Sequence, residues 1–203
     1  MPKPVAIVDN SFMAQATLLN EIRFLDRIRL LFDHLLFPEE VIKEFTPRKD
    51  IPENKIRNQI IGSLSVSQGF YRICNSKDQM ILTFLKSIDK VDAGEAEAIS
   101  QASVRSIPFI LIDDKKAIVR VQEKFGHLRF FNVLTLISLL ELNELLPSYQ
   151  RSLELYYGIR RFNSRELREA YIVAAAHLGL NKSKKEISQK TSLTKLGIGK
   201  INK

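Results

Sequence analysis

Short apolar runs alternate along the chain with longer segments in which apolar residues recur at helical spacing. Residues 5–8 and 109–112 are uninterrupted apolar runs, which are typical of strands buried on both faces of a parallel sheet. Further strands are predicted at 34–37, 70–74 and 128–131, and helices at 12–32, 38–45, 78–87, 92–103, 115–125 and 133–145. This alternation predicts an α/β fold with a mostly parallel central sheet flanked by helices.

Local signals sharpen several of these boundaries. Pro38 can occupy the first turn of a helix, where a missing N–H costs nothing. Asp92 and Glu95 have the spacing of a capping box, in which each side chain accepts a hydrogen bond from the other residue's backbone. Residues 46–55 contain two prolines and many charges and are interpreted as a loop within a long linker over 46–69.

The chain divides best at Pro147, which ends a strongly apolar helical segment. The expected parts are a domain over 1–147 and a small, basic, helical extension over 148–203. Residues 1–150 carry 19 basic and 19 acidic side chains, whereas 151–203 carry 12 and 4, so the whole net charge of +8 lies there. A basic module suggests contact with nucleic acid, and a lysine-rich solvated tail is the equally favoured alternative.

Composition excludes several classes of protein. No apolar run approaches the ~20 residues of a membrane span, and the amino-terminal run is too short for a signal-peptide core. We therefore expect a cytoplasmic protein without membrane contact. The single cysteine, Cys74, excludes an internal disulfide and a multi-cysteine metal site.

Acidic residues follow two of the predicted strands. Asp9 comes after the first strand, and Asp113 and Asp114 come after the most apolar one. Ligands of open parallel sheets bind outside the carboxyl ends of the strands, so these carboxylates are expected at one edge. Glu44 and Glu95 lie in helices that can reach the same edge.

Each acid also has a structural interpretation. Capping explains Glu95 by itself, helix propensity explains Glu97, and Glu44 could be one more solvated helix charge. Order and placement favour a functional role for Asp9 and for the Asp113–Asp114 pair. Gathered carboxylates repel one another unless a cation neutralises them, and hard oxygen ligands favour Mg²⁺ or Mn²⁺.

Four segments in this order resemble the PIN-domain family, particularly its toxin-like bacterial and archaeal branch. They are Val8–Ser11, Phe37–Glu44, Val91–Ile99 and Ile110–Ala117, with the patterns Asp-x-Ser, Pro-x-x-Val-x-x-Glu, Gly-Glu-x-Glu-Ala-Ile and Asp-Asp-x-x-Ala. The resemblance covers about residues 4–147. There are two departures: Asn10 stands where threonine is frequent, and Ile118 stands where an arginine commonly follows, with Arg120 two residues later.

The resemblance implies a Rossmann-like PIN fold and Mg²⁺- or Mn²⁺-dependent cleavage of single-stranded RNA. Carried over, the catalytic residues are Asp9, Glu44, Glu95, Asp113 and Asp114. The metal ligands among them would be Asp9, Glu95, Asp113 and Asp114, with Ser11 supporting and Glu97 secondary. The resemblance also implies a toxin role, an antitoxin protein as partner and a homodimer.

The basic extension has a second pattern. A helix over 164–178, a helix over 185–191, a turn with Thr194 as helix cap and a helix over 195–201 resemble a helix-turn-helix. Lys184, Lys185, Lys195 and Lys200 would then contact nucleic acid, including DNA. Gly197 and Gly199 weaken the last helix, so a small extension packed on the first domain, or a frayed tail, stays the alternative.

Two functions of different classes remain. The first is a metal-dependent endoribonuclease, and the second is a non-catalytic PIN-like regulator that binds DNA through its C-terminal helices. A nucleotide-binding Rossmann domain is disfavoured, because Asp9-Asn10-Ser11 stands where a glycine-rich phosphate loop would be needed.

Overall fold

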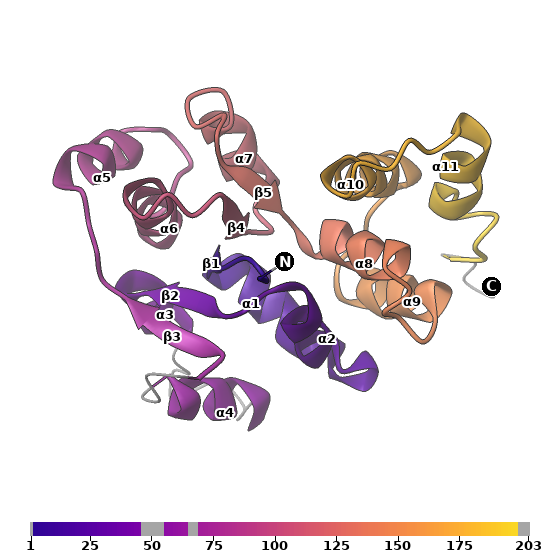
Figure 1. The fold of residues 1–203 in the computed structure, drawn as a ribbon, viewed down its shortest axis with the longest axis horizontal. Coiled ribbons are helices and arrows are strands. Elements are labelled where there is room, and N and C mark those ends of the chain that lie inside the picture. The colour runs from indigo at the N-terminus through magenta and orange to yellow at the C-terminus, as the bar shows by residue number, and fades with distance from the viewer. Residues whose placement is uncertain (1, 46–54, 65–68, 199–203) are drawn as a thin grey trace.

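A computed structural model describes residues 2–45, 55–64 and 69–198 of the chain. Its centre is a sheet of five parallel strands in the order β3-β2-β1-β4-β5 (Figure 1). The strands are β1 Ala6–Val8, β2 Leu35–Pro38, β3 Tyr71–Cys74, β4 Phe109–Leu111 and β5 Arg129–Phe131. This confirms the predicted α/β class and the parallel sheet.

Helices connect the strands and cover both faces of the sheet. Those that precede residue 147 are α1 Asn10–Ala16, η1 Thr17–Ile22, α2 Phe24–Leu31, α3 Glu39–Phe45, α4 Lys55–Ser63, α5 Gln79–Lys86, α6 Ala93–Val104, α7 Lys115–Val121 and α8 Val133–Leu142. After it come α9 Tyr149–Ile159, α10 Ser164–His177 and α11 Lys184–Thr191.

Alternating strand residues divide the interior into two cores. Ala6 and Val8 pack with α1, α2, α8 and the C-terminal helices, whereas Ile7 packs with α5, α6 and α7 on the opposite face. Leu36 and Ile110 lie in the same second core as Ile7. Successive side chains of a strand point to opposite faces, so strands that are apolar at every position are buried on both.

Three predicted boundaries were wrong. The helix expected over 12–32 is divided into α1, η1 and α2, and Arg23 between the last two has a left-handed backbone with φ of 51°. Pro38 is the last residue of β2, paired with Cys74, and the helix begins one residue later. Helix α4 lies in the segment interpreted as a linker, of which 46–54 and 65–68 are outside the described residues.

The C-terminal helices belong to the first core. Leu153, Tyr156 and Tyr171 are buried in it together with residues of α1 and α8. α10 packs along α8, and α11 packs on α10 (Figure 1). The helix expected over 195–201 does not form over its described residues. Residues 193–198 are turns, and Gly197 has a left-handed backbone with φ of 71°. Thr194 therefore caps no helix there, and 199–203 lie outside the described part.

Among the described residues, no helix combines the length and the apolar character needed to cross a membrane.

The shared core predicts that the C-terminal helices stabilise the whole molecule. Leu153→Ala should lower the free energy of unfolding by about 2–5 kcal/mol, because Leu153 is fully buried and its loss leaves a cavity. Chemical denaturation of the full chain measures this. Ile172→Ala is the control, since Ile172 on α10 is 45% exposed and should change stability little. Equal effects of the two substitutions would contradict the shared core.

Candidate carboxylate site at the edge of the sheet

Asp9 stands where β1 ends and α1 begins. Its backbone N–H donates to the carbonyl of Leu111 at 2.8 Å, which places it beside the end of β4. Its side chain caps α1: Oδ2 accepts from the N–H of Ser11 at 2.8 Å and from the Ser11 hydroxyl at 2.5 Å. Oδ1 is buried without a hydrogen-bond partner. Burial raises the pKa of Asp9 to about 6 despite the Ser11 contacts.

Ser11 joins the two central strand ends. Its hydroxyl donates to Asp9 and accepts from the backbone N–H of Asp113 at 3.0 Å. A hydroxyl can do both, which neither a carboxylate nor an ammonium group can. The serine predicted as a supporting residue therefore fixes the first aspartate relative to the segment that follows β4.

Glu44, on α3, reaches the same edge. Although the residue as a whole is exposed, its carboxylate lies against Gly94 in the first turn of α6. A Cβ added to Gly94 would come within 2.9 Å of both Glu44 oxygens, so a larger residue would displace the carboxylate. Desolvation, followed by repulsion from Asp92 and Asp9, raises the pKa of Glu44 to about 7.

Glu95 is buried at the start of α6 with 3% exposure. The predicted capping box is present: the N–H of Glu95 donates to Asp92 Oδ1 at 2.8 Å, and Glu95 Oε2 accepts from the Asp92 N–H at 3.0 Å. Burial is the main cause that raises the pKa of Glu95 to about 8, with repulsion from Asp92, Asp9 and Asp114 added. Capping and charge crowding therefore act on the same carboxylate.

Asp92 is the member of this cluster that sequence reasoning did not place in the site. It repels Asp9, Glu44 and Glu95 and so belongs to the same electrostatic group. Its capping spacing located it at the start of α6, but capping alone explained it, so only Glu95 of this turn was expected at the edge. We call Asp9, Glu44, Asp92, Glu95 and Asp114 the carboxylate cluster.

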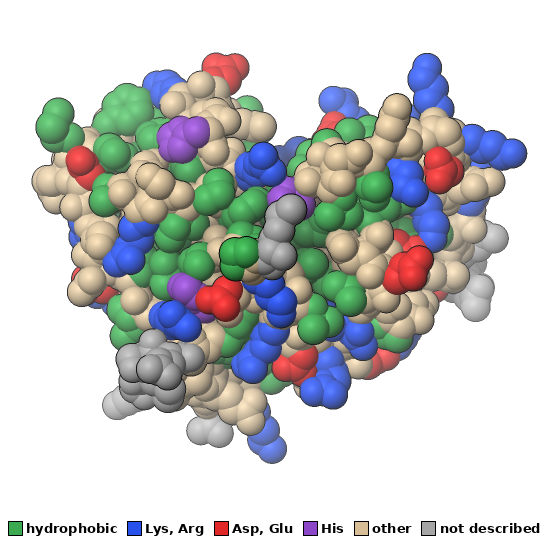
Figure 2. Space-filling view, viewed as in Figure 1, with side chains coloured by type: hydrophobic (Ala, Val, Ile, Leu, Met, Phe, Trp, Pro, Cys, Tyr) green, Lys and Arg blue, Asp and Glu red, His purple; other side chains and the backbone are tan. Residues whose placement is uncertain are grey.

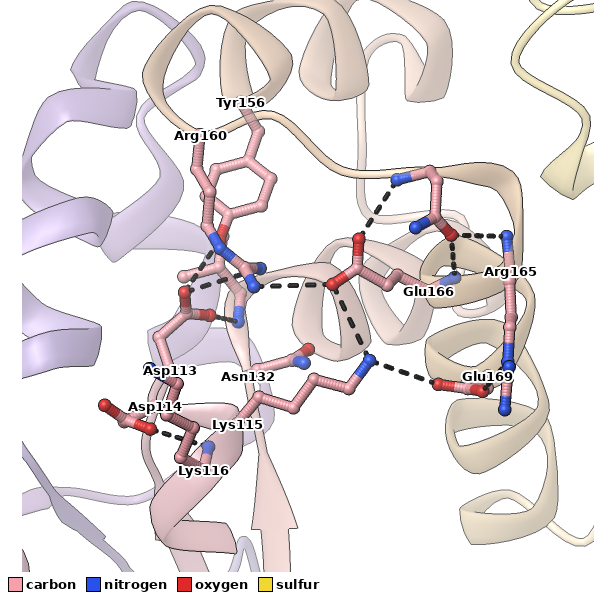
Figure 3. Close-up of polar contacts among 12 residues, drawn as sticks. Asp113, Asp114, Lys115, Lys116, Asn132, Tyr156, Arg160, Arg165, Glu166 and Glu169 are labelled. Carbon is pink, nitrogen blue, oxygen red and sulfur yellow. Dashed lines mark hydrogen bonds and ion pairs between the residues drawn. The ribbon is translucent and has the colours of Figure 1, made fainter. Parts of the chain in front are cut away.

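The two adjacent aspartates after β4 have different surroundings. Asp114 is half-buried and caps α7, accepting from the N–H groups of Lys116 and Ala117 at 2.6 and 3.1 Å. Asp113 is buried and both of its oxygens are engaged. Oδ1 accepts from the Val133 N–H at 3.0 Å, and Oδ2 accepts from the Tyr156 hydroxyl at 2.9 Å (Figure 3).

Further contacts of Asp113 reach the C-terminal helices. The Arg160 guanidinium, at the end of α9, lies 3.8 Å from Asp113 Oδ2 (Figure 3). Burial is the largest influence on Asp113 and raises its pKa against these favourable contacts. Asp113 therefore connects the end of β4 to α8 and α9. Both of its carboxylate oxygens accept hydrogen bonds, whereas only one oxygen of Asp9 does.

Glu97 is also buried, but its charge is compensated. Its carboxylate accepts from the Glu40 N–H at 2.7 Å and from Gln101 Nε2 at 3.1 Å, and it lies 2.9 Å from Lys77 Nζ. These contacts join α6 to the start of α3. Glu97, which the sequence analysis gave a secondary role, thus links α3 and α6, the helices that carry Glu44 and Glu95.

The lysines predicted to bind nucleic acid are distant in sequence from the carboxylate cluster. Lys184 and Lys185 are exposed on α11, and Lys195 is exposed in the turn that follows it. Lys200 lies outside the described residues. Their role in binding stays a prediction.

The carboxylate cluster fits a hard divalent cation by its chemistry. All of its donors are carboxylate oxygens, and Asp9 Oδ1 is a buried acceptor in need of a partner. Within the described ranges, no three acidic, histidine or cysteine side chains form a ready-made metal site. Asp9, Glu44, Glu95 and Asp114 are the residues that could approach a cation from this edge.

A five-stranded parallel α/β sheet with acids at its carboxyl edge defines a Rossmann-like protein with an acidic site. A family model described as PIN domain matches residues 6–173, and the chain belongs to this family. PIN domains are commonly nucleases and typically use metal ions. The match runs beyond residue 147 into α10. Neither a curated protein nor a solved structure gives a significant match to the chain.

The crowded charges predict opposite effects for two neighbouring glutamates. In EDTA at about pH 8, Glu95→Gln should raise the melting temperature, because it removes a carboxyl group that is unfavourable to ionise in the folded protein while keeping an acceptor for the Asp92 N–H. Glu97→Gln should lower it, because a buried partner of Lys77 is lost. The two variants serve as each other's control in thermal unfolding followed by circular dichroism.

The effect of Glu95→Gln should also depend on pH. A carboxyl group whose pKa rises on folding to about 8 favours the folded state below its ordinary range near 4.5. That contribution is lost as pH rises through 8, so the gain from Glu95→Gln should grow between about pH 5 and 8. A gain that is equal at both ends of this window would contradict the charge explanation.

Proposed function

We propose that this protein is a metal-dependent endoribonuclease that cleaves single-stranded RNA at the carboxylate cluster. The observation that carries the proposal is the buried, unpartnered Oδ1 of Asp9, surrounded by carboxyl groups whose pKa values are raised by burial and mutual repulsion. Such an arrangement is unfavourable without a cation. Membership of a family whose domains are commonly nucleases supports the same proposal.

In this proposal each residue has a separate task. Asp9, Glu44, Glu95 and Asp114 hold Mg²⁺ or Mn²⁺, while Ser11 fixes the direction of the Asp9 carboxylate. A bound divalent cation supplies charge neutralisation at the scissile phosphate and makes a water molecule more acidic. Asp113 acts as a positioning residue, because both of its oxygens are already occupied by Val133 and Tyr156.

The alternative function, a non-catalytic regulator that binds DNA, receives less support. The second helix of the expected helix-turn-helix is replaced by turns over the described residues 193–198. The toxin role, the antitoxin partner, the homodimer and the cytoplasmic location stay predictions.

Metal-dependent cleavage tests the proposal. The purified full chain with MnCl₂ or MgCl₂ should cut a fluorescently labelled single-stranded RNA internally, and EDTA should abolish the cut. Asp9→Asn should lower the cleavage rate by about a hundredfold or more, since it removes charge at the buried unpartnered position. Gel electrophoresis of the products measures both.

The matched control is Asp89→Asn, which removes the same charge from an exposed aspartate on the connection between α5 and α6. It should cleave as fast as the unmodified protein. Cleavage that survives Asp9→Asn, or that persists in EDTA, is the outcome against a carboxylate-bound metal. Absence of any cleavage with either metal would favour a non-catalytic function.

A further inference from the structure

A cavity of about 560 Å³ lies between α7, β5 and α10, beside the carboxylate edge. Figure 2 shows the surface hollowed between the part of the molecule that carries α7 and the part that carries α10. Its walls are largely apolar and include Ile118 of α7, Phe130 of β5 and Val173 of α10. A cavity of this size and character is suited to a ligand of nucleotide dimensions.

One end of the cavity adjoins the carboxylate edge. Arg160 lines it and also contacts Asp113 at 3.8 Å, and Asp113 is joined through its N–H to Ser11 and hence to Asp9. Lys115, which directly follows Asp114, extends across the cavity toward α10 (Figure 3). Two cationic side chains therefore line the cavity close to the aspartates that follow β4.

Carboxylates of α10 hold these cations in place. Lys115 Nζ lies 3.6 Å from both Glu166 and Glu169, and Arg160 Nη2 lies 3.5 Å from Glu166 (Figure 3). These ion pairs are loose and partly solvated, so each contributes little to stability. A phosphate oxygen that reached Arg160 would compete with Glu166 for it.

The opposite end of the cavity has a third cation and an aromatic lining. Arg129 donates to Nδ1 of His177 at 2.9 Å, and the His177 ring packs edge-on against Phe109 and Phe131. Burial, followed by repulsion from Arg129, lowers the pKa of His177, which agrees with an imidazole that accepts this hydrogen bond. This end thus offers an apolar floor with polar groups at its rim.

We propose that this cavity binds an unpaired nucleotide of the RNA strand next to the scissile bond. The base lies against the apolar wall, and its phosphate contacts Arg160 and Lys115. Bases bind sequence-tolerantly on apolar and aromatic surfaces beside cations, and only an unpaired base can enter such a cavity. The inference rests on the proposed ribonuclease function and adds where the substrate strand lies.

Binding to the full chain in EDTA separates this inference from catalysis. The probe is a fluorescein-labelled single-stranded RNA of mixed sequence, measured by fluorescence anisotropy beside the same RNA annealed to its complement. Val173→Trp, which fills the cavity, should weaken single-strand binding about tenfold, the size of one lost base contact. The unmodified protein should bind the duplex more weakly than the single strand.

Ile172→Trp is the matched control for the cavity. Ile172 is 45% exposed and Val173 is 44% exposed on the same helix, but only Val173 lines the cavity. Ile172→Trp should bind RNA within twofold of the unmodified protein. Circular dichroism verifies that both variants keep the fold. We expect them to do so, because both positions are partly exposed and can accept a larger side chain.

The salt dependence of RNA binding tests the phosphate contact separately. Arg160→Gln should weaken binding and lower the slope of log Kd against log salt by about 0.7, the value for one phosphate contact with a single strand. Arg165→Gln removes the same charge from a side chain of α10 that is 86% exposed and outside the cavity, and should leave the slope unchanged. Glu166→Gln should strengthen binding, because it removes the competing carboxylate but keeps the cap of α10.

The inference is overturned if Val173→Trp and Ile172→Trp bind RNA alike, or if Arg160→Gln and Arg165→Gln have equal salt slopes. Cleavage by the unmodified protein together with unaltered binding by Val173→Trp would leave the ribonuclease proposal standing and remove this one. Cavity-dependent binding of RNA without any metal-dependent cleavage would remove the ribonuclease proposal and leave the cavity as an RNA-binding site with no scissile bond.

Discussion

The burial of like charges at the carboxyl edge of the sheet is the constraint on which the rest of the site depends. Three of the acids involved, Asp9, Asp92 and Asp114, are the N-caps of α1, α6 and α7. These helices begin at one edge, so their positive ends and free N–H groups stabilise the carboxylates that cap them. This compensation is partial, because burial and repulsion still raise the pKa values of Asp9 and Glu95.

Much of this arrangement follows from short-range patterns in the sequence. The apolar runs that precede Asp9 and Asp113 determine two neighbouring strands, and a parallel sheet brings their ends together. The capping box at Asp92 and Glu95 is equally local and was predicted correctly. What the sequence could not supply was how closely the start of α6 approaches Asp9 and Glu44, which makes Asp92 part of the cluster. That approach depends on packing between segments far apart in the chain.

The errors have the same origin. Arg23 divides a segment with continuous helical periodicity, and neither glycine nor proline marks the break. Pro38 is compatible either with the first turn of a helix or with the end of a strand. Its pairing with Cys74 shows that it ends β2. The double engagement of Asp113 by Val133 and Tyr156 was also invisible locally, since Tyr156 lies 43 residues away. Two adjacent aspartates therefore looked equivalent, although only Asp114 keeps the surroundings of a simple helix cap.

The contacts of Asp113 show that the basic segment 151–203 packs against the acidic edge of the sheet. The excess positive charge lies entirely within 151–203, which suggested a module separate from the cluster. Arg160 belongs to that segment, yet it lies against Asp113 and lines the cavity beside the carboxylate edge. Some of the remaining charge serves packing, since Lys190 pairs with Glu141 at the end of α8. The C-terminal helices thus bring the Arg160 cation to the acidic edge of the sheet. Tyr156 on α9 holds this helix at the edge through its hydrogen bond to Asp113.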